Sequence, residues 1–148
     1  MNDSSAREST ASLMLRLVLA IVFLLHGSQK LFGVLGGRGF AGTVQGFQQG
    51  LHVPLPIAWL GAVTEFATAV LLLAGLLTRV AAAWLLGFML VATYLGGHLE
   101  HGFFMNWSGR QDGEGVEYNL CLMVMCLAVF VLGGGTWSLD AKLRRLGR

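Results

Sequence analysis

Long apolar stretches separated by short polar segments run along most of this chain. Four stretches of about 20 residues each lie at about residues 13–33, 55–78, 80–99 and 117–134. A helix needs about 20 apolar residues to cross a bilayer. The first stretch also resembles the core of a signal peptide, but no small-residue cleavage site follows it before Lys30. The pattern therefore predicts an all-α membrane protein built as a four-transmembrane-helix bundle.

A shorter amphipathic pattern lies between the first two predicted spans. Phe40, Val44, Phe47 and Leu51 recur at helical spacing and form one apolar stripe, with glutamines on the other faces. The prolines that follow the stripe end the helix and open the next span. We expect a short interfacial helix in the first outer loop, lying on the membrane surface.

The two ends of the chain are polar and are expected outside the membrane. Residues 1–12 are rich in Ser and Thr and predict a disordered cytoplasmic tail. Residues 13–141 form the membrane domain, and residues 142–148 form a basic cytoplasmic tail. Most Lys and Arg fall on the side of the two termini: Arg7, Arg16, Arg79, Lys142, Arg144, Arg145 and Arg148. The positive-inside rule therefore predicts a multi-pass protein with both termini in the cytoplasm.

The composition agrees with a membrane protein. Hydrophobic residues make up 55% of the chain and charged residues 12%, which is about half the charge of a soluble domain. Cys121 and Cys126 are too few for a disulfide framework. The net charge of +2 is modest and the basic residues form no stripe, so we expect no nucleic-acid partner. The expected surroundings are membrane lipid.

Two ionisable residues lie deep within the predicted spans. An ionisable side chain at the bilayer centre costs about 2.5–3.5 kcal/mol on insertion scales. The spacing from Pro56 places Glu65 about 13–14 Å from the outer end of its helix, and His26 lies about 10 Å below the same surface. We expect Glu65 to pair with His26 or with Lys30, while Arg16 snorkels inward and Lys30 outward.

Other polar side chains gather at the outer ends of the predicted helices: Tyr94, His98, His101, Glu117 and Tyr118. The inner half of the bundle is expected to be almost purely apolar. A simpler interpretation stays open for several of these residues. Lys30, His101 and Glu117 can be interfacial residues that face water, and Tyr94 can be an aromatic of the membrane belt.

Several motifs run through nearly the whole chain, from about residue 15 to residue 141. They are RLVLAIVFLLHGSQKLFG, a glycine-rich loop, GAVTEFATAVLLLAGLLTR, EYNL and GGTWSLDA. Together they resemble the DoxX family of small four-helix bacterial membrane proteins. The resemblance implies a bundle in the inner membrane and an association with quinone-linked or redox-stress chemistry. Relatives include the small subunit of a thiosulfate:quinone oxidoreductase and a partner in a membrane-associated oxidoreductase complex.

The family's motif residues can be placed on this chain. The histidine and lysine of its first helix fall at His26 and Lys30, its second-helix glutamate at Glu65, and its Glu-Tyr pair at Glu117 and Tyr118. The preceding loop, NWSGRQDGEG, is more polar than the family pattern. This difference could alter access to the outer mouth of the bundle.

These observations favour an accessory subunit of a quinone-linked or redox-stress oxidoreductase. In this hypothesis Glu65 and His26 are catalytic and exchange protons. The ligand pocket in the outer half is formed by Lys30, Tyr94, His98, Glu117 and Tyr118. The implied cofactor is a quinone, and a redox partner protein supplies the electrons, because the chain has no haem, flavin or iron–sulfur motif.

Three alternatives stay open. The same residues could form a binding or proton-coupled transport site for a small molecule, which would need a homo-oligomer because four helices are few for alternating access. A metal site built from His26, Glu65, His98 and His101 is the weakest alternative. The protein could also be a membrane anchor for a soluble partner, without catalysis.

Overall fold

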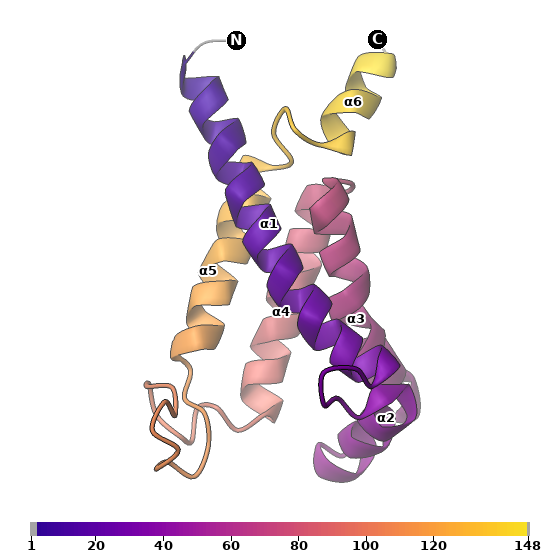
Figure 1. Ribbon diagram of the computed structural model, residues 1–148, viewed down its shortest axis with the longest axis vertical. Coiled ribbons are helices and arrows are strands. Elements are labelled where there is room, and N and C mark those ends of the chain that lie inside the picture. The colour runs from indigo at the N-terminus through magenta and orange to yellow at the C-terminus, as the bar shows by residue number, and fades with distance from the viewer. Residues whose placement is uncertain (1–2, 148) are drawn as a thin grey trace.

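The computed structural model describes residues 3–147, and every regular element in this range is a helix (Figure 1). The helices are α1 (Asp3–Phe32), α2 (Gly39–Gly50), α3 (Leu55–Ala74), α4 (Thr78–Leu95), α5 (Glu117–Leu132) and α6 (Leu139–Leu146).

Three of the helices, α1, α3 and α4, are long and apolar enough to cross a membrane. The fourth predicted span corresponds to α5, an apolar helix of 16 residues, which is about 24 Å long. The prediction of an all-α membrane protein is confirmed. The predicted spans 55–78 and 80–99 extend beyond the helices, which end at Ala74 and Leu95.

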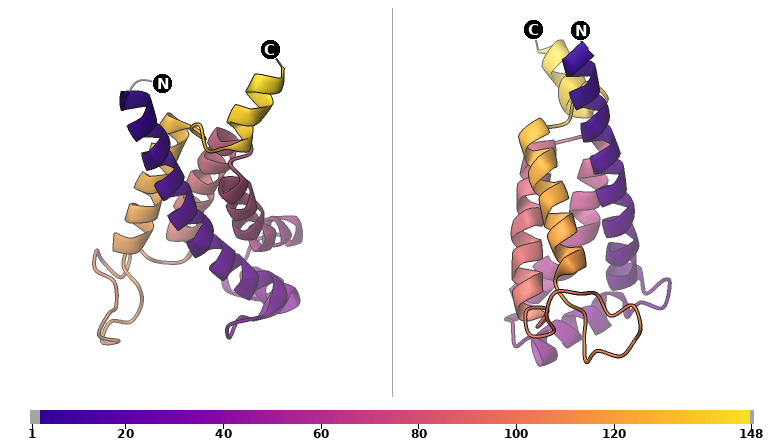
Figure 2. Two further views of the ribbon diagram at one scale, coloured as in Figure 1. Left: turned by 45° about the horizontal axis from the view of Figure 1, so that its top comes forward. Right: turned by 90° about the vertical axis from the view of Figure 1, so that its left-hand side faces the viewer.

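The helices form a bundle with two distinct ends. α1 crosses the bundle diagonally and packs against α2, α3 and α5, while α4 packs between α3 and α5 (Figures 1 and 2). Both chain ends lie at one end of the bundle, together with α6, and we call this the terminal end. α2 and the loop of residues 96–116 lie at the opposite end, the distal end.

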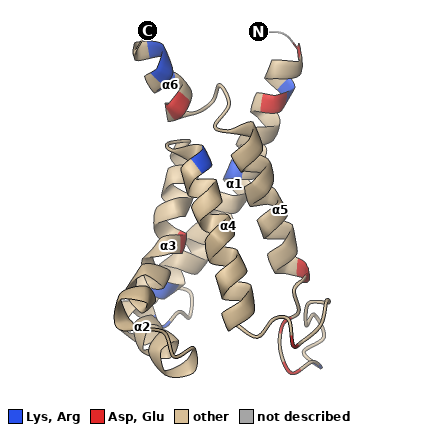
Figure 3. Ribbon diagram, turned by 180° about the vertical axis from the view of Figure 1, so that it is seen from behind, with Lys and Arg blue, Asp and Glu red and all other residues tan. Residues whose placement is uncertain are grey.

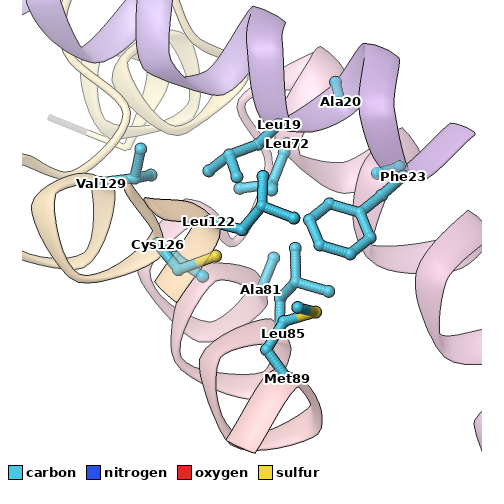
Figure 4. Close-up of a cluster of buried hydrophobic side chains, with 12 residues drawn as sticks. Leu19, Ala20, Phe23, Leu72, Ala81, Leu85, Met89, Leu122, Cys126 and Val129 are labelled. Carbon is cyan, nitrogen blue, oxygen red and sulfur yellow. The ribbon is translucent and has the colours of Figure 1, made fainter. Parts of the chain in front are cut away.

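The four long helices share one apolar core. Leu19 and Phe23 of α1 face Leu85 of α4 and Leu122 of α5, and all four side chains are buried (Figure 4). α1 and α3 approach closely at Gly27, where a Cβ atom would lie only 2.6 Å from the backbone nitrogen of Phe66. Small residues at such crossings let membrane helices pack backbone to backbone.

The predicted short helix in the first loop is confirmed as α2, which packs against α1 and α3. Its apolar stripe faces the bundle, because Val44 is buried in a small cluster with Ala58 and Ala62 of α3. Phe47, from the same stripe, packs against this cluster. The stripe is therefore covered by protein in the part nearest α3.

The expected disordered tail over residues 1–12 needs correction. α1 already begins at Asp3, so residues 3–12 are helical, while residues 1 and 2 lie outside the described part of the chain. The physical reason is tertiary contact. The Ser12 hydroxyl donates to the carbonyl of Gly133, and the Ser9 hydroxyl accepts from the backbone N–H of Thr136 at 3.2 Å.

The expectation of an almost purely apolar inner half is also wrong, because Arg16 lies fully buried there. Its guanidinium donates from Nη1 to the carbonyl of Leu72 at 3.0 Å and from Nη2 to the carbonyl of Trp137 at 2.7 Å. Arg16 therefore does not snorkel to the surface. It joins the end of α3 to the segment that follows α5.

The N-terminus of α4 is capped from a distant part of the chain. The Asp140 carboxylate accepts from the backbone N–H groups of Leu77 and Thr78 at 2.8 and 2.9 Å, and its own N–H donates to the carbonyl of Gly75 at 2.9 Å. Burial raises the pKa of Asp140, but hydrogen bonds from Thr78 and Leu77 and the charge of Arg144 outweigh it, so the pKa lies below its usual value. The GLLTR and WSLDA motifs therefore meet at one point.

Candidate functional site

An ion pair joins α1 and α3 near the distal end. Lys30 Nζ lies 2.5 Å from Glu65 Oε1, and the Glu65 side chain is only 7% exposed. Glu65 is midway along the 20-residue α3, about 15 Å from its start. The close approach of α1 and α3 at Gly27, one helical turn before Lys30, brings the two side chains within reach. Of the two expected pairings, the structure has the one with Lys30.

Two aromatic rings flank the Lys30 ammonium group. Its nitrogen lies 5.9 Å from the ring centre of Phe47 on α2 and 5.9 Å from that of Phe88 on α4. This arrangement permits cation–π attraction. Lys30 therefore contacts α2, α3 and α4 from its place on α1.

Glu65 keeps one oxygen free. Its Oε2 atom is buried and has no hydrogen-bond partner within residues 3–147. A buried acceptor without a partner is costly, so such a group is a candidate site for a proton or a ligand donor.

A pocket of about 590 Å³ opens beside the ion pair, between α2, α3 and α4. This volume is in the range of small-molecule pockets, about 300–1,000 Å³. Its walls include Phe47, Ile57, Leu60, Thr64, Trp84, Phe88 and Val91. The Thr64 hydroxyl accepts from the Trp84 indole N–H at 3.3 Å and joins α4 to α3 across the wall. Among residues 3–147, Lys30 is the only charged residue that lines the pocket.

The other residues predicted on the outer half of the helices lie away from this pocket. His26 is exposed. The buried residues of α1, from Ser9 to Gly27, share one face of the helix, and His26 lies outside that face. Tyr94 is 73% exposed and Tyr118 is 37% exposed. The structure therefore brings Lys30 and Glu65 together and leaves these three side chains on the outside.

His98 and Glu117 hold the distal loop in place. His98 Nδ1 lies 2.9 Å from the carbonyl oxygen of Glu114, and the Glu117 carboxylate accepts from the backbone N–H of Met105 at 3.1 Å. Neither residue lines the pocket. Across residues 3–147, no group of three or more His, Cys, Asp or Glu residues could hold a metal ion.

Sequence reasoning missed the aromatic residues of the site. Trp84 and Phe88 are spaced by four residues on α4, so they share one face of that helix. This spacing was a usable signal, but apolar positions facing a pocket look the same in sequence as positions facing lipid. Phe47 was predicted on the apolar stripe of α2, without its contact to Lys30.

The sequence of this chain is similar to a known protein family and to two inner membrane proteins. The family model described as DoxX matches residues 11–98, which include Lys30, Glu65 and the aromatic side chains of the pocket. Inner membrane protein YqjF of Escherichia coli (strain K12) is 27% identical over 138 residues, covering 93% of this chain and 95% of the relative. Inner membrane protein YphA of the same organism is 26% identical over 147 residues, covering 95% of each. No solved structure matches the chain.

Proposed function

The chain belongs to the DoxX family, and we propose that it is an inner-membrane protein that binds a quinone in the pocket between α2, α3 and α4. In this proposal it serves as an accessory subunit for a partner oxidoreductase. The observation that carries the proposal is the Lys30–Glu65 ion pair at the edge of an otherwise apolar pocket. The names of the two relatives support the inner membrane as the location.

The residues of the pocket fit a quinone by their chemistry. A quinone has two carbonyl oxygens that accept hydrogen bonds and an apolar ring with a prenyl tail. The Lys30 ammonium donates and has no acceptor role, and apolar side chains line most of the remaining wall. The free Oε2 of Glu65 adds a buried acceptor next to this donor.

Each group of the chain has a distinct part in this proposal. Lys30 donates a hydrogen bond to one ligand oxygen and orients the ring, while Glu65 fixes the ammonium group and holds or releases a proton at Oε2. Phe47 and Phe88 flank the ammonium group and attract it through their rings. When bound, the quinone supplies a two-electron acceptor that takes up two protons, and the partner protein supplies the electrons.

We further propose that α5 crosses the membrane as the fourth span and that the terminal end faces the cytoplasm. α5 itself ends at Leu132, and the non-helical glycines at positions 133–135 continue the uncharged stretch beyond it. Most of the described Lys and Arg residues lie toward the terminal end, on α6, in the first half of α1 and at the start of α4 (Figure 3). This distribution supports the orientation through the positive-inside rule.

The test of quinone binding uses Trp84, which lines the pocket. A variant in which the other three tryptophans are replaced by Phe reports on this residue alone, and a short-chain quinone is titrated into the detergent-purified protein. We expect saturable quenching of the Trp84 fluorescence. Lys30→Met should weaken binding at least about tenfold, because a hydrogen bond to a charged group contributes about 1.5–3 kcal/mol.

The matched control is Lys142→Met, which removes a lysine from the exposed face of α6. This variant should bind the quinone as the parent does. Quenching that rises linearly without saturation, or equal affinity in the Lys30→Met variant, would refute quinone binding in this pocket. Mass spectrometry of the organic extract from gently purified protein gives a second readout, because a co-purified quinone should disappear with Lys30→Met.

A further inference from the structure

We propose that a second pocket, at the terminal end, binds the phosphate group of an anionic phospholipid. This pocket of about 350 Å³ lies between α6 and the adjoining ends of α4 and α5. We call it the basic pocket, and its lining includes Thr78, Arg79, Gly133, Gly134, Leu143 and Arg144. It shares no lining residue with the pocket beside Lys30, so the inference does not depend on quinone binding.

Two guanidinium groups from different helices line the basic pocket. Arg79 lies in the first turn of α4 and Arg144 in the last turn of α6. Arg79 donates from Nη2 to the carbonyl of Val131 at 3.0 Å, and Arg144 donates from Nε to the carbonyl of Asp140 at 3.2 Å. Each of these bonds uses one of the five N–H donors of its guanidinium. The others can bind phosphate oxygens, for which the planar guanidinium fork is well suited.

The acidic residue in the same pocket does not cancel this charge. Asp140 also lines the pocket, but both of its oxygens accept backbone N–H groups at the start of α4. The basic pocket therefore has two positive groups and one carboxylate, and this carboxylate already accepts hydrogen bonds from the backbone.

The position of the basic pocket identifies the anion as a lipid. Arg79 is the second residue of α4, a helix long and apolar enough to cross the membrane, so the pocket lies at the bilayer boundary. Directly on the membrane side, Val80 and Val131 are 63% and 64% exposed. Charged donors next to exposed apolar surface match a phosphate group attached to acyl chains, whereas a free phosphate ion would gain nothing from the valines.

The shape of α6 also favours a lipid surface. Leu139, Leu143 and Leu146 are exposed and fall on one face of the helix at intervals of four and three residues. The basic side chains of α6 lie on the other faces. Helices with this pattern bind at the boundary between headgroups and acyl chains, and their affinity rises with the content of anionic lipid.

Native mass spectrometry of the detergent-purified protein tests the inference. Phosphatidylglycerol and phosphatidylcholine with identical acyl chains are added at equal concentrations, and the bound fraction of each is measured. We expect selective retention of phosphatidylglycerol. Arg79→Gln and Arg144→Gln should each weaken its binding roughly fivefold, and the double variant about 25-fold, as expected for the loss of about 1 kcal/mol of hydrogen bonding to the phosphate group with each guanidinium.

The matched control is Arg145→Gln, which removes the same charge from the same helix at a residue that does not line the basic pocket. It should leave phosphatidylglycerol binding within about twofold of the parent, since about 0.4 kcal/mol is within the scatter of a surface charge. An equal loss in Arg144→Gln and Arg145→Gln would mean diffuse attraction and would overturn the inference. Equal binding of the two lipids would overturn it as well.

A competition experiment distinguishes a lipid from a soluble anion. Inorganic phosphate at millimolar concentration should not displace phosphatidylglycerol, because it lacks the acyl chains that cover Val80 and Val131. Displacement would show a site for soluble anions and contradict the lipid assignment. Arg144 lies on an exposed helix that makes few contacts with the bundle, so its variant should fold normally even if Arg79→Gln is destabilised by the loss of its bond to Val131.

Discussion

Removing Lys30 and removing Glu65 should destabilise the fold by unequal amounts, because the two side chains of this ion pair are buried to different extents. Lys30→Met leaves the Glu65 carboxylate without its counter-charge at a side chain that is 7% exposed. Glu65→Gln leaves Lys30, whose side chain is 28% exposed, with a neutral partner that still offers a hydrogen-bond acceptor. The structure therefore predicts that losing the lysine destabilises the fold more than losing the glutamate.

The expected magnitudes follow from burial. Removing one partner of a buried pair costs about 3–5 kcal/mol, and we expect about 3 kcal/mol for Lys30→Met because Lys30 is partly exposed. Glu65→Gln should cost about 1 kcal/mol, since a lysine can extend its ammonium group toward water. In the double variant no buried charge lacks a partner. Adding Glu65→Gln to Lys30→Met should therefore restore about 2 kcal/mol of the free energy of unfolding.

The assay is reversible unfolding of the four detergent-purified proteins by sodium dodecyl sulfate, followed by circular dichroism at the helix band. The double-mutant cycle gives the interaction free energy between the two side chains. Lys142→Met is the control for loss of a lysine, and it should leave the midpoint unchanged because Lys142 is exposed on α6. A Lys30→Met variant as stable as the parent, or a double variant less stable than Lys30→Met, would refute the reasoning.

Three further predictions concern other parts of the fold. Gly27→Ala should lower the melting temperature in detergent, at a cost of about 1–3 kcal/mol, because the new Cβ would lie 2.6 Å from the backbone nitrogen of Phe66. Arg16→Met should cost about 3–5 kcal/mol in the same unfolding assay, because it removes two hydrogen bonds from a buried guanidinium. The pKa of Asp140 is lowered in the fold, so its contribution to stability is present above pH about 4 and is lost as the pH falls through that lowered value. Asp140→Asn should therefore lower the melting temperature at pH 7 and reduce its fall in acid.

Each of these variants has a matched control. Gly50→Ala adds a Cβ where no atom lies within 4 Å, and equal melting temperatures for Gly27→Ala and Gly50→Ala would contradict the close helix contact. Arg7→Met removes an exposed arginine from the same helix as Arg16, so an equal effect would contradict the role of the buried hydrogen bonds. An unchanged acid profile in Asp140→Asn would contradict the assigned cap.

The sequence was informative wherever local pattern decides structure. The apolar runs predicted the positions of α1, α3, α4 and α5, because a span needs only length and hydropathy. The stripe through Val44 predicted α2, because four apolar residues at helical spacing define a face. The depth of Glu65 in its span likewise predicted that this residue would need a partner.

Features that depend on distant residues were not predictable in the same way. The choice between His26 and Lys30 as the partner of Glu65 depends on how α1 is rotated, and the backbone contact at Gly27 sets that rotation. His98 was expected near the ligand, but the loop folds back so that it contacts the carbonyl of Glu114. The pocket beside Lys30 arises from the angles between three helices, which no local pattern contains.

The helical start of α1 and the burial of Arg16 have the same origin. Serine-rich segments have weak helix propensity, and an arginine near a span end normally extends to the surface. Both expectations fail because residues 133–137 lie against this part of α1 and accept or donate its hydrogen bonds. Those partners are more than 120 positions away in the chain.

The burial of Arg16 has a consequence for how this protein is made. One of its two acceptors, the carbonyl of Trp137, follows it by 121 residues. At about 5–20 residues per second, the ribosome needs roughly 6–24 s to synthesise that interval. During most of this time the carbonyl of Leu72, 56 residues after Arg16, is available as an acceptor, but the carbonyl of Trp137 is not. The final packing of this part of α1 therefore waits for the last part of the chain. A nascent chain that stalls before Trp137 therefore lacks one of the two backbone acceptors of the Arg16 guanidinium.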